Sequence, residues 1–193
     1  MPRIIGEAIN TKVSLTNNIK MPKTTRIPLS GFQMKQLNPD ARLMRYTDLY
    51  HYKTSKDLFK DTDKIVLLYL TTSNTSGHYV GLFKNKNGVI NYFDSYGMPM
   101  DYHFELLSNK LRNELNEPVN YLQKLLWNDK VIFNNITYQK SRTATCGFHT
   151  SFRLLNSHLS EQEYFDFFVN NNLEPDIFVS NWGFQKINNI DDI

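Results

Sequence analysis

The chain has 193 residues, of which 40% are hydrophobic and 13% aromatic, so it can fill the core of one globular domain. Its only cysteine, Cys146, excludes an internal disulfide framework and fits a reducing compartment. No apolar run is long enough to span a membrane and no secretory signal follows Met1, so we expect no membrane partner.

The net charge of +3 is concentrated near the start of the sequence. Residues 1–28 hold five basic side chains and one acid, Glu7, together with three prolines and little hydrophobic periodicity. We predict a basic, extended N-terminal arm over residues 1–28, followed by a single domain over residues 29–193. Such an arm could make a weak contact with nucleic acid, or it could simply be a solvated terminus.

Three short helices are predicted before the first strand. Ser30, Asp40 and Thr54 can cap them, because a side-chain oxygen at a helix start accepts a backbone N–H. The first helix ends before Pro39, which disfavours helical backbone in the residue ahead of it. The second would direct Leu43 toward the core.

The pattern changes at residues 64–70 (KIVLLYL), a continuous apolar run typical of a central strand that is buried on both faces. A second strand is predicted at residues 78–84 and a third at residues 89–94. The sequence NKNG at residues 85–88 is a hairpin signal. The second and third strands are therefore expected to be antiparallel neighbours.

This hairpin would bring His78 and Asp94 together. In an antiparallel pair the first residue of one strand lies beside the last residue of its partner. The midpoint between the two residues is Lys86, inside the expected turn. A carboxylate beside an imidazole can hold one tautomer and stabilise the charged ring. Taken alone, His78 would be a strand-end histidine and Asp94 a turn former.

The rest of the chain gives weaker signals. Residues 119–127 read as a helix, with a strand as the alternative, and residues 131–133 and 136–138 as short strand-like pieces. Ser160 opens a capping box before another helix. The tail from Leu173 carries aromatic residues that we expect to pack on the core.

Cys146 is predicted to lie where a loop enters a buried helix. The apolar residues that follow it are spaced by four, three and four positions: Phe148, Phe152, Leu155 and Leu159. A thiol at a helix N-terminus has a lowered pKa and is more often the nucleophilic thiolate. The alternative is a small buried hydrophobe, so a catalytic role needs a base and oxyanion donors.

Four motifs in chain order, GHYVGLF, NYFDSYG, YQ and CGFHTSF, resemble the adenovirus maturation protease and its relatives, the ubiquitin-like-protein proteases. The resemblance covers about residues 64–156, and it is strongest to the maturation proteases of virophages and Polinton-type elements. It includes the seven-residue gap between Gln139 and Cys146. The resemblance implies an α+β, papain-like or adenain-like fold. A central mixed β-sheet would be flanked by helices, with the catalytic cysteine at the N-terminus of a core helix.

The resemblance also implies the roles of the site residues. Cys146 would attack the scissile carbonyl, His78 would transfer the proton and Asp94 would orient His78. The side chain of Gln139 and the backbone N–H of Cys146 would form the oxyanion hole. The substrate groove is assigned to Tyr79, where relatives commonly carry tryptophan, and to Gly147, which follows the cysteine.

The function that the resemblance implies is a viral cysteine endopeptidase. It would process capsid or core precursors at Gly-Gly or Gly-X sites during maturation, in the virion and in the virus factory of the host cytoplasm. The alternatives are a protease that removes a ubiquitin-like modifier and a catalytically silent binding module of the same fold. With no second cysteine, an activator would be a non-covalent peptide or DNA.

No metal or other cofactor is expected. Cys146 and His149 are three residues apart on the predicted helix, but no second pair of ligands at suitable spacing follows them. His149 is a rival to His78 as the base, although it lies one turn into the helix and does not explain the hairpin pairing.

Overall fold

A computed structural model describes residues 20–73, 76–107, 109–115 and 120–191. The described strands are β1 (Arg42–Arg45), β2 (Lys64–Ser73), β3 (Ser76–Lys84), β4 (Ile90–Phe93) and β5 (Val131–Phe133). The described α-helices are α1 (Gly31–Leu37), α2 (Ser55–Leu58), α3 (Asn109–Leu115), α4 (Tyr121–Leu125), α5 (Cys146–Leu155), α6 (Glu161–Asn170) and α7 (Pro175–Asp191). The 3-10 helices are η1 (Lys23–Arg26), η2 (Tyr46–His51) and η3 (Tyr102–Leu106).

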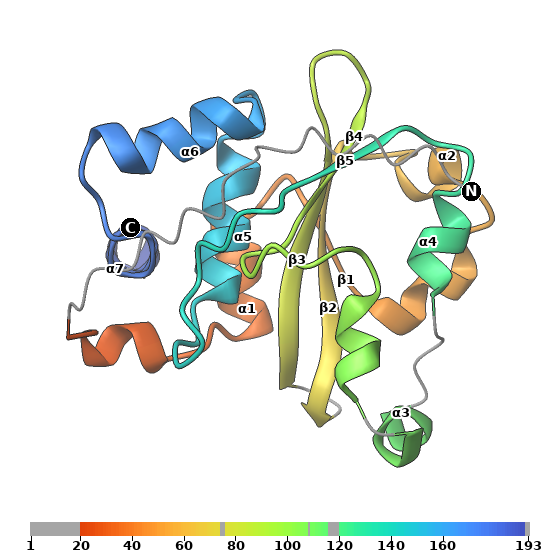
Figure 1. The fold of residues 1–193 in the computed structure, drawn as a ribbon, viewed down its shortest axis with the longest axis horizontal. Coiled ribbons are helices and arrows are strands. Elements are labelled where there is room, and N and C mark those ends of the chain that lie inside the picture. The colour runs from red at the N-terminus through yellow and green to blue at the C-terminus, as the bar shows by residue number, and fades with distance from the viewer. Residues whose placement is uncertain (1–19, 74–75, 108, 116–119, 192–193) are drawn as a thin grey trace.

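The fold is α+β, with one mixed sheet in the order β1-β2-β3-β4-β5. The central strands β2, β3 and β4 are antiparallel, while β1 and β5 join them in parallel at the two edges. Helices α5, α6 and α7 lie on one side of the sheet and α2 and α4 on the other (Figure 1). The three strands and the helical flanks predicted from the sequence are confirmed.

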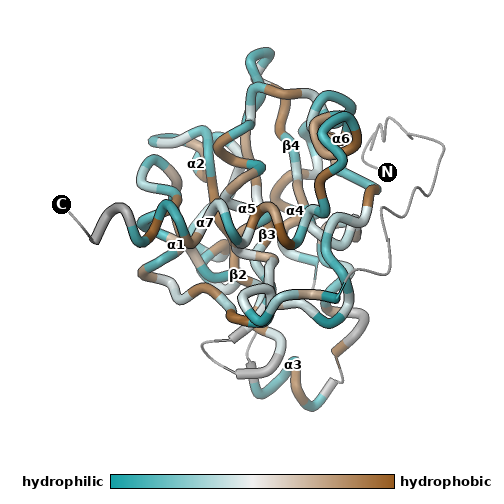
Figure 2. Tube along the Cα trace, turned by 90° about the vertical axis from the view of Figure 1, so that its left-hand side faces the viewer, coloured by the Kyte–Doolittle hydropathy of each residue, from teal (hydrophilic) through white to brown (hydrophobic). Residues whose placement is uncertain are grey.

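Strand β2 is buried on both faces, as its continuous apolar run predicted. Val66, Leu68 and Leu70 pack with α5, α6 and α7, while Ile65, Leu67 and Tyr69 pack with the helices on the opposite face. Burial of such side chains is the main favourable term in folding. Both hydrophilic and hydrophobic residues occur along α7 and its neighbours (Figure 2).

Several local predictions were wrong or incomplete. The segment after Asp40 is strand β1, not a helix, because Leu43 pairs with Val66 of β2 and this pairing outweighs local helix preference. Residues 136–138 form no strand. In α5, Leu155 is 55% exposed, so the predicted buried stripe is interrupted there, although Leu159 still packs against the core. The tail from Leu173 forms the long helix α7.

The predicted N-terminal arm is only partly described. Residues 1–19 lie outside the described residues. From Lys20 the chain is not extended throughout, since it contains η1 and buries Thr25. The backbone N–H of Ala144 donates to the Thr25 carbonyl at 2.8 Å. This segment therefore packs against the loop that leads into Cys146.

Candidate active site

His78 and Asp94 lie side by side, as predicted, although the hairpin register differs from the expected one. His78 Nε2 is 3.1 Å from Asp94 Oδ2. Gly81 pairs with Phe93, so the observed pairing is shifted by two residues and the carboxylate reaches His78 diagonally. A slip of two residues keeps each side chain on its own face of the sheet, whereas a slip of one would have separated them.

The turn after β4 fixes the Asp94 carboxylate. Its Oδ1 accepts the backbone N–H of Tyr96 at 2.7 Å. Asn134 holds the Asp94 backbone from both sides, at 2.8 Å to its N–H and 2.7 Å to its carbonyl. The turn closes at Gly97, whose φ of +70° favours glycine. The Tyr96 ring stacks on the His78 ring with centroids 5.1 Å apart.

Cys146 is the first residue of α5, and its helix is fastened to β3 beside His78. Thr150, one turn further along, donates to the backbone carbonyl of Tyr79 at 3.1 Å. The partly exposed Cys146 thiol hydrogen-bonds the His78 imidazole. Because Nε2 of His78 contacts Asp94, the nitrogen left to face the sulfur is Nδ1.

The electrostatics of the site favour a thiolate and an imidazolium. Burial alone would raise the pKa of the Cys146 thiol, but the His78 interaction and the backbone N–H groups of Tyr79 and Gly147 outweigh it and lower the pKa. Burial alone would lower the pKa of His78, but the charge and hydrogen bond of Asp94 and the contact with Cys146 raise it to about 10. The position of the sulfur at a helix N-terminus acts in the same direction.

A second histidine, His103, contacts the same carboxylate and was missed by sequence reasoning. Its Nε2 lies 2.5 Å from Asp94 Oδ2, and its ring centroid lies 4.4 Å from that of His78. It is a buried residue of η3. Neither periodicity nor motif marks it, because His103 reaches Asp94 only through the tertiary position of η3.

Gln139 is buried with a fixed side-chain orientation. Its Oε1 accepts the Ser95 hydroxyl at 2.7 Å, and its Nε2 donates to the Thr143 carbonyl at 3.0 Å. An amide has two N–H donors, so one remains after the contact with Thr143. Ser95 directly follows Asp94. One turn therefore orients both Asp94, which holds the predicted base, and Gln139, the predicted oxyanion donor.

The two predicted groove residues lie in different surroundings. Tyr79 lines a cleft of about 390 Å³ whose other lining residues are Gly31, Leu43, Met44, Arg45, Asp48 and Leu68. Gly147 is buried instead. A Cβ built on it would lie 2.8 Å from the Met34 sulfur and 3.1 Å from a Leu29 methyl group. The α-carbon of Gly147 therefore packs against Met34 and Leu29, which leave no room for a side chain. Its backbone N–H hydrogen-bonds the Cys146 thiol.

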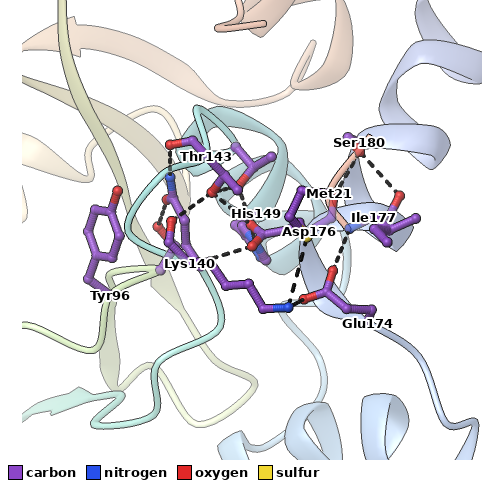
Figure 3. A network of polar contacts seen from close by, with 12 residues as sticks. Met21, Tyr96, Lys140, Thr143, His149, Glu174, Asp176, Ile177 and Ser180 are labelled. Atoms are coloured by element: carbon purple, nitrogen blue, oxygen red, sulfur yellow. Dashed lines mark hydrogen bonds and ion pairs between the residues drawn. The ribbon is translucent and has the colours of Figure 1, made fainter. Parts of the chain in front are cut away.

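His149, the rival base, lies in a second histidine–carboxylate pair. Its Nε2 is 3.0 Å from Asp176 Oδ1, and both side chains are fully buried. This pair uses residues of α5 and α7 and is separate from the hydrogen bond between Cys146 and His78. Within this pair, Asp176 also contacts Lys140, Thr143 and Thr145 in the loop that leads to Cys146 (Figure 3).

Among the described residues, one cluster has the composition of a metal site. One ligand atom each of His78, Asp94 and His103 lie within 4.8 Å of one another. Both histidines already have Asp94 Oδ2 as a hydrogen-bond partner, so a metal ion there would replace these contacts. Metal-free operation stays a prediction.

Fold and site together define an α+β protein with a cysteine, a histidine and an aspartate in series at the N-terminus of a core helix. No protein-family model matches the chain. Uncharacterized protein V9 of Sputnik virophage is 31% identical over 144 residues, which cover 72% of this chain and 82% of V9. The chain therefore belongs to the family of this virophage protein.

Three solved structures show a distant likeness in fold. The central domain of uncharacterized Lpg1148 from Legionella pneumophila is 17% identical with a TM-score of 0.44, over 87% of this chain and all of that domain. The yeast Ulp1 protease domain, solved with Smt3, is 15% identical with a TM-score of 0.38, over 81% and 74%. An ASFV protease is 15% identical with a TM-score of 0.37, over 76% and 68%.

None of the described helices is both long and apolar enough to cross a membrane.

Proposed function

We propose that the protein is a cysteine endopeptidase with Cys146 as nucleophile, His78 as base and Asp94 as the residue that orients His78. The observation that carries the proposal is the continuous contact from the Cys146 thiol through both nitrogens of His78 to Asp94. The lowered pKa of Cys146 and the raised pKa of His78 support it, since an activated thiolate beside an imidazolium is what thiol proteolysis needs.

The reaction follows from this order of groups. Cys146 Sγ bonds to the scissile carbonyl carbon while His78 holds the thiol proton, and the carbonyl electron pair moves onto oxygen. The intermediate collapses with cleavage of the C–N bond, and His78 gives its proton to the departing amine. Water then attacks the thioester, His78 takes its proton, and the sulfur leaves and is reprotonated.

The negative oxygen of the intermediate needs preorganised donors. Gln139 offers the amide N–H that Thr143 does not occupy, and the backbone N–H of Cys146 is the second donor by analogy with the resembling proteases. A neutral amide stabilises the oxyanion without forming an ion pair with the thiolate. This division of roles suits a thiol protease.

We propose capsid or core precursors as the substrates, cleaved at Gly-Gly or Gly-X sites in the virion and virus factory. Membership in a virophage family and the motif resemblance support a viral maturation role. The cleft beside Tyr79 is the proposed path of the substrate. An activating peptide or DNA, if one is used, would bind without a disulfide, and the basic arm is the proposed nucleic-acid contact.

Two other functions are compatible with the same fold. A protease that removes a ubiquitin-like modifier would use the same residues, and the choice between the two depends on the substrate. A silent binding module is disfavoured because Cys146, His78, Asp94 and Gln139 are all present and in hydrogen-bond contact with neighbouring groups.

Co-expression with candidate viral capsid precursors tests the proposal. The wild-type chain should cleave them after small residues, as mapped by mass spectrometry, and Cys146→Ala should leave them intact. Modifier fusions in parallel separate maturation from deconjugation. Processing that survives in Cys146→Ala would remove the nucleophile.

A further inference from the structure

The carboxylate of Asp176, in the first turn of α7, is fully buried and collects donors from one short stretch of chain. Lys140 donates its backbone N–H to Oδ2 at 2.9 Å. Oδ1 accepts the Thr145 hydroxyl, contacts His149 Nε2 at 3.0 Å and is 3.3 Å from the Thr143 hydroxyl. All four donors belong to residues 140–149 (Figure 3).

These contacts hold both ends of the loop that separates two site residues. Lys140 directly follows Gln139, and Thr145 directly precedes Cys146. The Thr145 hydroxyl makes no capping bond to α5 and donates to Asp176. The middle of the loop is held too, since Thr143 contacts Asp176 through its hydroxyl and Gln139 Nε2 through its carbonyl.

We infer that Asp176 is a positioning residue, which sets the separation and direction of Gln139 relative to Cys146 and thereby shapes the oxyanion site. The inference rests on the proposed protease function. Asp176 contacts no reacting atom and acts through the loop. A buried carboxylate is well suited to this task because it accepts several hydrogen bonds at once and breaks none when the oxyanion forms.

The inference predicts different effects on two reactions of the Cys146 sulfur, amide hydrolysis and alkylation. Hydrolysis of an amide passes through an oxyanion, whereas alkylation of the thiolate by iodoacetamide does not. Loss of Asp176 should therefore slow hydrolysis and leave the His78-dependent alkylation unchanged. A general loss of structure would slow both and lower the melting temperature.

The test uses the full chain with a peptide ending in Gly-Gly-aminomethylcoumarin. Asp176→Asn should lower kcat by about 10²-fold, the effect of losing one oxyanion donor, with KM and the alkylation rate of Cys146 within about twofold. Combined with Gln139→Ala it should cost little more than either change alone, because both disturb the same donor. The matched control is Glu174→Gln, a neighbouring acid that contacts the Lys140 side chain at 3.0 Å rather than the loop backbone, and it should keep full activity.

Thr145→Val removes one donor to Asp176 while keeping the side-chain shape, and it serves if Asp176→Asn fails to fold. It should lower kcat by about tenfold at an unchanged alkylation rate. An unchanged kcat in the folded variants, or kcat and alkylation falling together, would overturn the inference. If the wild-type chain neither cleaves the peptide nor alkylates faster than glutathione, the proposed function fails and the inference with it.

Discussion

The two histidine–aspartate pairs of this protein have nearly the same internal geometry and very different surroundings. His78 lies 3.1 Å from Asp94, and His149 lies 3.0 Å from Asp176. The second ring nitrogen of His78 meets the Cys146 thiol, whereas Nδ1 of His149 has no hydrogen-bond partner within the described part of the chain. A buried pair is thus no sign of catalysis by itself.

The carboxylates differ as well. Asp94 contacts two histidines and one turn N–H, whereas Asp176 contacts the backbone and hydroxyl donors of a single loop. Interactions with the histidines outweigh the effect of burial and lower the pKa of each carboxyl. We therefore assign proton transfer to the His78–Asp94 pair and the positioning of the loop to the His149–Asp176 pair. The same substitution made in each histidine tests this difference.

The largest effect is expected from His78→Leu. The variant has no base for the thiol, so cleavage should fall by at least about 10³-fold, within the range of general acid–base catalysis. Initial rates on the coumarin peptide measure it, with circular dichroism as the check on folding. Retention of more than a tenth of the activity would contradict the assignment.

His149→Leu should act mainly on stability. It leaves the Asp176 carboxylate buried without its histidine, which should cost about 2–4 kcal/mol of unfolding free energy. Denaturant titration measures the loss, and cleavage per folded molecule should fall far less than in His78→Leu. A stable variant that loses cleavage as completely as His78→Leu would contradict this division of roles.

His103→Leu should have the smallest effect. Without His103, Asp94 would contact one histidine instead of two and would hold His78 less firmly. The kcat should therefore fall by about tenfold, which corresponds to the free energy of roughly one hydrogen bond. Steady-state kinetics on the same peptide give the number. A loss as large as that of His78→Leu would show that the two histidines act as one catalytic unit.

Much of the site could be predicted because its residues lie at the ends of strongly patterned elements. The strands at 64–70, 78–84 and 89–94 and the helix after Cys146 were readable from apolar runs, and they bring His78 close to Asp94. The predicted register was wrong by two residues, but the even shift preserved the contact. The role predicted for Gln139 in the oxyanion hole came from the family resemblance alone.

His103 and Asp176 could not be predicted from the sequence. His103 reaches Asp94 from η3, whose position depends on tertiary packing, and Asp176 reaches its loop from α7, a helix that the sequence suggested only as a packed tail. Strand β1 was misread for a related reason, since its pairing with β2 is a long-range contact. Local pattern carries no information on such contacts.

The most direct test of the central claim is the rate at which iodoacetamide modifies Cys146 as a function of pH. The lowered pKa of Cys146 places its midpoint below that of an unperturbed thiol, with the rate falling as pH drops through the midpoint. In His78→Leu the midpoint should move upward, because burial is then opposed only by the backbone N–H groups of Tyr79 and Gly147 and the helix N-terminus. A wild-type midpoint at or above that of glutathione, unchanged in His78→Leu, would contradict the account.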